Sequence, residues 1–202
     1  MQGTMTIRNA TVRDINDIVT IHIDAFKGFF LTSLGTDFLK FYYTVFLKSS
    51  ETVTLVAEKD GKVAGFSAAT TNSKGFNSRL IRGNLFSFVK LSLILLFSDP
   101  KALFRLAKNL TKKSSEVADN EEYAELYSIG VDRFQQGNGI GKKMLAATED
   151  ALREKGVEKV SLTTDYINNE RTVGFYRTMG YETLYVFVAF PNRKMYRFIK
   201  TL

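Results

Sequence analysis

The sequence contains no cysteine, a single histidine and only two prolines among its 202 residues. The absence of cysteine excludes disulfide bonds, cysteine-ligated metals and a covalent cysteine acyl-enzyme. A single histidine argues against a protein metal site, because such sites combine several metal-ligating side chains. That histidine, His22, lies among apolar residues of a predicted helix, so we interpret it as a structural side chain.

Length and hydrophobic content indicate how the chain is organised. With 202 residues, 45% of them hydrophobic, it has the size of one ordinary globular domain over residues 1–202. The first thirteen residues are polar and lack the apolar core of a secretory signal peptide, which predicts a cytoplasmic protein. The apolar run 85–97 would span roughly 20 Å as a helix, which is too short to cross a bilayer.

The net charge of +7 is concentrated in residues 79–113. This segment has eight basic residues and one acid: Arg79, Arg82, Lys90, Lys101, Arg105, Lys108, Lys112, Lys113 and Asp99. The basic residues indicate an anionic partner, and those after Pro100 recur at the spacing of an amphipathic helix. We consider packed helices or a homodimer interface, a substrate lid, and contact with an anionic membrane surface. Nucleic-acid binding is not expected, because no recognised module presents the patch.

Hydrophobic periodicity predicts alternating strands and helices. The predicted strands cover 6–9, 52–58, 62–69, 122–131, 158–164, 181–190 and 193–199, and the predicted helices cover 14–26, 37–47, 142–155 and 168–179. Lys59-Asp60-Gly61 predicts a hairpin between the second and third strands. This order indicates an α/β fold with a mixed sheet and helices on both faces. Residues 71–121 are too long for a simple connection and predict a helical insertion, with one helix over 84–97.

Gln136-Gly137-Asn138-Gly139-Ile140-Gly141 lies between a predicted strand and a predicted helix. Alternate glycines allow a tight turn and close approach of the backbone to a ligand. Free N–H groups at a helix N-terminus favour a phosphate or pyrophosphate, through hydrogen bonds of roughly 1.5–3 kcal/mol each. The spacing excludes a P-loop, because Gly141-Lys142 is followed by Lys143, and it is not that of a dinucleotide fingerprint. A glycine-rich turn without a ligand is the alternative.

The wider context resembles a known family. Residues 123–141 resemble the signature of the GCN5-related N-acetyltransferases (GNAT): a strand ending in apolar-x-Val, a turn, then [Arg/Gln]-x-x-Gly-x-[Gly/Ala]. A second motif follows, in which Asn169 precedes Tyr176 by seven residues and Gly180-Tyr181 replaces the family's usual Gly-Phe. The resemblance implies a mixed, mostly antiparallel sheet of about seven strands flanked by helices on both faces. It also implies transfer of an acetyl group from acetyl-CoA, with no metal.

The resemblance assigns roles in cofactor binding. The loop 136–141 would hold the CoA pyrophosphate, and the pantetheine arm would pair with the strand end 129–131 as an added strand. Asn169 would hydrogen-bond the cofactor arm or cap the helix predicted over 168–179, and Asn168 is an equal candidate for the cap. The expected cofactor-binding residues are Ile129, Gly130, Val131, Gln136, Gly137, Asn138, Gly139, Ile140, Gly141, Lys142 and Asn169.

Two further side chains are expected to carry the chemistry. Tyr176 stands at the position of the family's general acid, which protonates the leaving thiolate; packing on the sheet is its alternative role. Glu125, six residues before Val131, stands where some relatives carry a catalytic glutamate. Asp165 and Glu122 are the other candidates for the base. Without a cysteine, the simplest mechanism is direct attack of the amine on the thioester in a ternary complex.

The expected acceptor is a primary amine on a small molecule. The basic insertion suits an anionic acceptor, such as a nucleotide-linked amino sugar, and also a membrane-associated one. A peptide or protein N-terminus, a lysine side chain, and a non-catalytic acyl-CoA-binding module are the alternatives. Four phenylalanines either line an acceptor pocket or belong to the core: Phe26, Phe29, Phe30 and Phe38.

Overall fold

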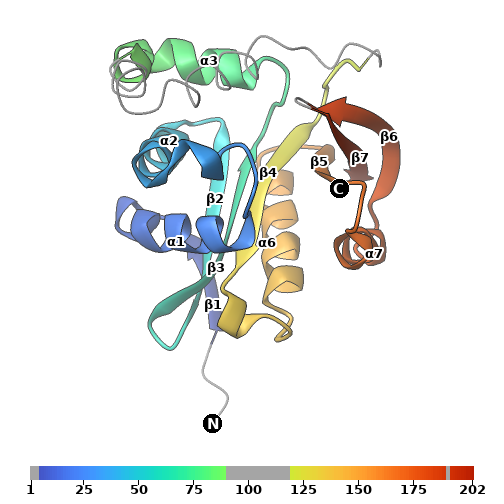
Figure 1. Cartoon of the computed structure of the whole chain (residues 1–202), viewed down its shortest axis with the longest axis horizontal. Coiled ribbons are helices and arrows are strands. Elements are labelled where there is room, and N and C mark those ends of the chain that lie inside the picture. Colours follow the sequence, from blue (N-terminus) through green and yellow to red (C-terminus); the bar gives the residue numbers. More distant parts are fainter. Residues whose placement is uncertain (1–4, 90–118, 190–191) are drawn as a thin grey trace. The chain divides into compact units, whose positions relative to one another are not determined.

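A computed structural model describes residues 5–89, 119–189 and 192–202 (Figure 1). The described residues fall into two compact units. The first unit lies within Met1–Thr71 and Leu126–Val157, and the second within Asn72–Glu125 and Glu158–Leu202. The expectation of one domain over residues 1–202 therefore stays a prediction.

The described part of the first unit contains four strands, three α-helices and three short 3-10 turns. Its elements are β1 (Met5–Asn9), η1 (Val12–Asp14), α1 (Ile15–Ala25), η2 (Thr32–Leu34), α2 (Thr36–Lys48), β2 (Thr52–Lys59), β3 (Lys62–Thr70), most of β4 (Ala124–Val131), η3 (Arg133–Gln135) and α6 (Ile140–Glu154). The strand order is β1-β2-β3-β4, and β2 pairs with both β1 and β3 in antiparallel fashion. Helix α6 begins two residues before the predicted start at position 142.

Two consecutive residues of β3 show that helices cover both faces of the first unit's strands. The Phe66 ring lies 6.4 Å from that of His22 in α1 and 5.5 Å from that of Tyr43 in α2, measured between ring centroids. The neighbouring Ser67 hydroxyl is hydrogen-bonded to the Thr148 hydroxyl of α6 at 2.7 Å. Because successive strand residues point to opposite faces, α1 and α2 cover one face and α6 covers the other.

Glycines define two tight places in the first unit. Asp60 and Gly61 both have positive φ, 53° and 72°, as the predicted two-residue hairpin requires. At Gly130, an added Cβ would lie 2.9 Å from Phe66 Cε1 and 3.2 Å from Ile21 Cγ2. Packing of α1 and β3 against β4 therefore explains this glycine, with or without a ligand at the strand end.

The second unit contains the remaining strands, each close to its predicted bounds. Its elements are α3 (Phe76–Gly83), the start of β4, β5 (Lys159–Asp165), α7 (Glu170–Thr178), β6 (Glu182–Ala189) and β7 (Arg193–Thr201). The strand order is β5-β7-β6, and both pairs are antiparallel. All seven predicted strands are present, and the predicted fold class, a mixed and mostly antiparallel sheet flanked by helices, is confirmed.

The predicted insertion is described only at its ends. Helix α3 was not predicted separately; it buries Phe76 and Leu80, and residues 85–89 after it are also helical. The rest of the predicted helix over 84–97 and the basic helix after Pro100 lie outside the described residues. Within the described ranges, no helix is both long and apolar enough to cross a membrane.

Candidate active site

Residues 136–139 of the glycine-rich loop are exposed, and the loop's conformation explains two of its glycines. Gly137 and Gly139 have φ values of 84° and 73°, in the left-handed region that side chains other than glycine rarely adopt. No atom lies within 4 Å of a Cβ built on either residue, so backbone conformation, and not lack of space, requires glycine there. The turn leads directly into α6.

Three backbone N–H groups at the start of α6 lie outside the hydrogen bonds of the helix. The Lys143 N–H donates to the Gly139 carbonyl at 3.1 Å, as the first bond of the helix. The N–H groups of residues 140–142 therefore have no intrahelical acceptor. They lie at the positive end of a helix of fifteen residues, where a phosphate is favoured.

Side chains of the loop support the turn itself. Gln136 Nε2 donates to the Val131 carbonyl at 3.4 Å, and Asn138 Nδ2 donates to the Gln135 carbonyl at 3.3 Å. Lys59 Nζ donates to Gln135 Oε1 at 3.2 Å. The side chains of Gln136 and Asn138 thus stabilise the loop. The contacts predicted between these two residues and a pyrophosphate would therefore come from their backbone N–H groups.

In the second unit, Glu125 is buried and held at both carboxylate oxygens. Oε1 accepts from Arg197 Nη1 at 2.7 Å, and Oε2 accepts from the Ser73 hydroxyl at 2.6 Å. The side chains of Glu125 and Arg197 are 12% and 13% exposed, so this ion pair is shielded from solvent. Burial acts to lower the pKa of Arg197, but Glu125 and neighbouring tyrosines raise it above its ordinary value.

A second carboxylate, Asp119, belongs to the same set of contacts. Its Oδ2 accepts from the hydroxyls of Tyr123 at 2.5 Å and Tyr185 at 2.7 Å. Burial acts to raise the pKa of Asp119, but these two bonds lower it below its usual range. The Arg197 guanidinium lies 5.7 Å from the Tyr123 ring centroid and 5.9 Å from that of Phe187. No sequence motif indicated Ser73, Asp119 or Arg197.

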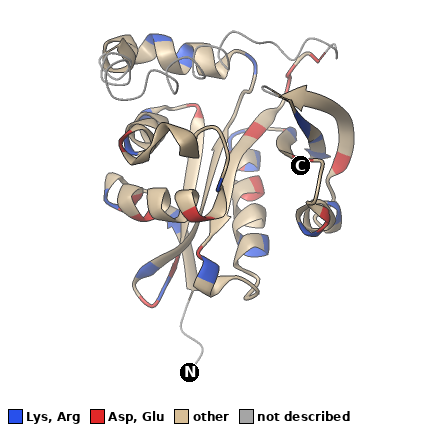
Figure 2. Ribbon diagram, in the orientation of Figure 1, with Lys and Arg blue, Asp and Glu red and all other residues tan. Residues whose placement is uncertain are grey.

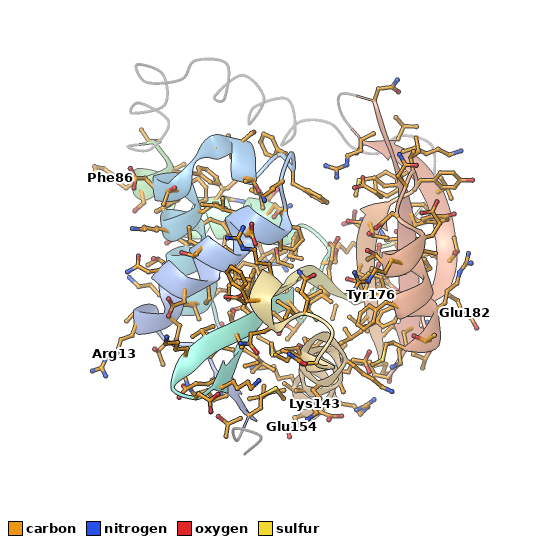
Figure 3. All side chains as sticks on the ribbon, turned by 60° about the horizontal axis from the view of Figure 1, so that its bottom comes forward. Arg13, Phe86, Lys143, Glu154, Tyr176 and Glu182 are labelled. Carbon is orange, nitrogen blue, oxygen red and sulfur yellow. The ribbon has the colours of Figure 1, made fainter. Side chains whose placement is uncertain are left out.

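Tyr176, labelled in Figure 3, lies on α7, and its ring belongs to an aromatic cluster. Its ring centroid is 5.7 Å from that of Tyr181 and 6.1 Å from that of Phe198. Burial raises the pKa of the Tyr176 phenol above its ordinary value, so the hydroxyl keeps its proton throughout the neutral range. The cluster provides the predicted packing on the sheet, and it holds a protonated hydroxyl in a fixed place.

Asn169 and the two other candidates for the base, Asp165 and Glu122, lie outside the contacts of Glu125. Asn169 is the N-cap residue of α7, but its side chain makes no capping bond. Its amide donates instead to Thr164 Oγ1 at 2.7 Å and to the Asp165 carbonyl at 3.0 Å. The Asp165 carboxylate is paired with the Arg193 guanidinium, and Glu122 is exposed. Of the three candidates for the base, Glu125 is the buried one.

The four phenylalanines proposed for an acceptor pocket separate into two groups. Phe38 is 3% exposed and belongs to the core of the first unit, where its ring stacks on Tyr42. Phe26, Phe29 and Phe30 are half-buried in the connection between α1 and α2. The interpretation of Phe38 as core is therefore the better one, and the other three remain candidates.

Two basic residues of the predicted patch lie on α3 and are drawn in blue in Figure 2. The Arg79 guanidinium donates to the Asn72 carbonyl at 3.2 Å and also to the Lys74 carbonyl. Arg82 Nε donates to the Ser78 carbonyl at 3.4 Å. Arg79 thus stabilises the segment before α3. The other basic residues of the patch, from Lys90 to Lys113, lie outside the described residues.

His22 is a buried, neutral side chain of the first unit. It is 2% exposed, and its Nδ1 lies 2.7 Å from the Tyr43 hydroxyl. Burial lowers the pKa of His22 to about 4. The structural interpretation of this histidine agrees with its burial. In the described part of the chain, no three His, Cys, Asp or Glu side chains are grouped so as to hold a metal ion.

Acid should destabilise the protein through His22 before it affects the carboxylates. Between pH 6.5 and 4 the unfolded chain binds a proton at this imidazole and the folded protein does not. Stability is therefore fully present above pH 6.5 and should fall by about 3 kcal/mol as the pH drops to 4. Urea unfolding at several pH values measures this loss, which His22→Gln should lack.

Asp14 provides the control for this experiment. A hydrogen bond from Arg8 lowers the pKa of Asp14 to about 2, so its contribution is lost only below about pH 4. An equal decline between pH 6.5 and 4 in the wild type and in His22→Gln would contradict the assignment to His22.

Comparisons with known proteins agree with the two motifs. The model of the Acetyltransferase (GNAT) family matches residues 15–181. The chain is similar to a mycothiol acetyltransferase of Kocuria rhizophila, with 32% identity over 82 residues, which are 41% of this chain and 27% of that protein. It is also similar to an uncharacterized N-acetyltransferase of Methanocaldococcus jannaschii, with 23% identity over 180 residues. That match covers 89% of this chain and 61% of that protein, so the chain spans less than two thirds of either relative.

A solved structure shows the same fold. The chain is similar to a protein of Salmonella typhimurium that was solved with its cofactor acetyl-CoA, with a TM-score of 0.61 and 17% identity. The match covers 98% of this chain and 94% of that one. Because the family model covers most of its length, this chain belongs to the acetyltransferase (GNAT) family.

Proposed function

We propose that this protein transfers an acetyl group from acetyl-CoA to a primary amine of a small-molecule acceptor. The amine nitrogen attacks the thioester carbonyl, a C–N bond forms and the C–S bond breaks. The amine loses one proton and the CoA thiolate gains one. The observation that carries the proposal is the loop 136–141, which places N–H groups without an intrahelical acceptor at the start of α6 in a chain of this family.

The first unit would hold the cofactor. The N–H groups of residues 140–142 would bind the pyrophosphate, with Lys142 as a nearby positive charge. The pantetheine arm would pair with the backbone of residues 129–131 as an added strand. A backbone N–H there would polarise the thioester carbonyl as an oxyanion donor. Asn169 would hydrogen-bond the cofactor arm.

The second unit would supply the acid and the base. Tyr176 would donate its phenolic proton to the departing thiolate. Glu125 would take the proton of the amine, directly or through a water molecule. A carboxylate has about four lone-pair sites, and contacts with Ser73 and Arg197 use two of them, so Glu125 retains the capacity to accept another proton donor.

The acceptor is the finer part of the proposal. Several relatives are named mycothiol acetyltransferases, which favours a small-molecule acceptor over a protein one. The basic residues of 79–113 favour an acceptor with a negative charge, such as a nucleotide-linked amino sugar. A peptide or lysine acceptor, or contact of this segment with an anionic membrane surface, would predict a different set of active substrates.

Thiol release from acetyl-CoA tests the activity directly. The protein has no cysteine, so a thiol reagent reports free CoA without background from the enzyme. The acceptors to compare are amino sugars, their nucleotide conjugates, polyamines and peptides. Release with one class would identify the acceptor. Saturable binding of acetyl-CoA without release across the panel would favour a non-catalytic acyl-CoA-binding module, and absence of binding would contradict the proposal.

The loop itself is tested by Gly139→Ala, with Gly156→Ala as its matched control. Both glycines have left-handed φ values, 73° and 77°, open space around a Cβ, and positions at opposite ends of α6. Each substitution should cost about 1 kcal/mol of stability. Only Gly139→Ala should weaken acetyl-CoA binding, by about 10-fold or more, because it displaces a donor to the pyrophosphate. Isothermal titration calorimetry measures the acetyl-CoA affinity of both variants. Equal affinities would refute the assignment of the pyrophosphate site to this loop.

A further inference from the structure

Phe134 is a large aromatic side chain that the protein leaves in solvent beside the glycine-rich loop. The residue is 78% exposed, although it is two positions before Gln136 in a short helical turn, η3. Its backbone is fixed, because the Phe134 N–H donates to Asp132 Oδ1 at 2.7 Å. A single exposed apolar residue needs no special explanation by its exposure alone. Its position and its neighbours are what indicate a role.

Arg133 contacts the Phe134 ring and leaves most of it exposed to solvent. The guanidinium carbon lies 4.5 Å from the Phe134 ring centroid, in a cation–π contact. Arg133 Nη1 is 3.8 Å from Asp24 Oδ1, and its side chain is 61% exposed, so solvent also reaches this charge. An aromatic surface and a positive charge are therefore presented together, immediately before the loop that would bind a pyrophosphate.

The two ends of CoA leave its pyrophosphate in opposite directions. One end is the pantetheine arm, which the proposed function assigns to the strand end 129–131. The other end is a 3′-phosphorylated adenosine, which combines a flat aromatic base with a negative charge. An exposed phenylalanine can stack on such a base, and an exposed arginine can pair with such a phosphate.

We propose that Phe134 is the stacking platform for the adenine of CoA, and that Arg133 fixes the ring and attracts the 3′-phosphate. This inference rests on the proposed function, because it takes the pyrophosphate position at residues 136–141 from it. Stacking of a base on an aromatic side chain typically changes affinity by about 5- to 150-fold. The expected effect is therefore measurable from a single substitution.

The test compares CoA with 4′-phosphopantetheine, which lacks the 3′-phospho-AMP half of CoA, by calorimetry or competition. Phe134→Ala should weaken CoA binding by about 5- to 150-fold and leave binding of 4′-phosphopantetheine unchanged. Phe134→Tyr, which keeps an aromatic ring, should bind CoA like the wild type. Phe86→Ala is the matched surface control, because Phe86 is 92% exposed and lies in a different part of the sequence (Figure 3).

The dependence on ionic strength distinguishes the contribution of Phe134 to CoA affinity from that of Arg133. The loss in Phe134→Ala should be nearly the same at low and high salt, because stacking is not a charge interaction. The loss in Arg133→Gln should shrink as salt rises, because added ions screen its attraction to the 3′-phosphate. A loss in Phe134→Ala that vanished at high salt would overturn the stacking role.

The outcomes distinguish this inference from the proposed function. If the wild type binds CoA and Phe134→Ala binds it equally well, the inference fails and the proposed function stands. Equal weakening of CoA and 4′-phosphopantetheine would also overturn it, since that result would mean damage to the loop. If the wild type bound neither CoA nor acetyl-CoA, both proposals would fail.

Discussion

Tyr176→Phe is expected to lower kcat for acetyl transfer by about 10²- to 10⁴-fold and to leave acetyl-CoA affinity within about twofold. The substitution removes only the phenolic hydroxyl, so the packing of the ring against Tyr181 and Phe198 is retained. In this role the hydroxyl acts on the departing thiolate, a charge that is absent from the ground state. Its loss should therefore appear in kcat and leave cofactor binding intact.

Tyr181→Phe is the matched control for this prediction. Tyr181 is 2% exposed, belongs to the same aromatic cluster as Tyr176, and stands where the family usually has phenylalanine. Its hydroxyl has no proposed part in the chemistry, so kcat should stay within a few-fold of the wild type. A similar loss of kcat in both variants would attribute the effect to the cluster and contradict Tyr176 as the acid. Steady-state kinetics with calorimetry on the same samples gives both quantities.

Arg197→Met should destabilise the protein by about 3–5 kcal/mol, because it leaves the buried carboxylate of Glu125 without its cation. The double variant Glu125→Gln with Arg197→Met should be much more stable than this single variant. It removes both charges at once, so no unpaired charge stays buried. Urea unfolding of the wild type, the two single variants and the double variant yields the coupling energy between the side chains.

A surface ion pair provides the comparison for Arg197. Arg153 pairs with Asp150 at 2.5 Å, but these side chains are 47% and 67% exposed. Arg153→Met should therefore change stability by less than about 1 kcal/mol. Equal effects of the two Arg→Met substitutions would show that burial of the Glu125–Arg197 pair does not determine its contribution.

The parts of the site that depend on local sequence were predictable. Gly137 and Gly139 follow from backbone conformation within a few residues, and the Asp60-Gly61 hairpin follows from turn chemistry. Each strand could be placed within a few residues, because the alternation of apolar side chains reports burial directly. Asn169 and Tyr176 are predicted through a motif spacing that needs only the start and the body of one helix.

The contacts of Glu125 could not be predicted in this way. Its partners Ser73 and Arg197 are 52 and 72 residues away in sequence, and only the tertiary fold brings them to it. One signal was present, because Arg197 is a charge between Tyr196 and Phe198 in an otherwise half-buried strand. Such a residue needs a partner, but the sequence does not say which acid supplies it.

Both ends of the insertion are attached at one residue, Tyr123. The Ser73 N–H donates to the Tyr123 carbonyl at 2.9 Å, and Asp119 accepts from the Tyr123 hydroxyl. The described residues on either side of positions 90–118 are therefore connected through Tyr123, directly before β4. We therefore expect a change in the length of residues 90–118 to leave the start of β4, and with it the Glu125 carboxylate, in place.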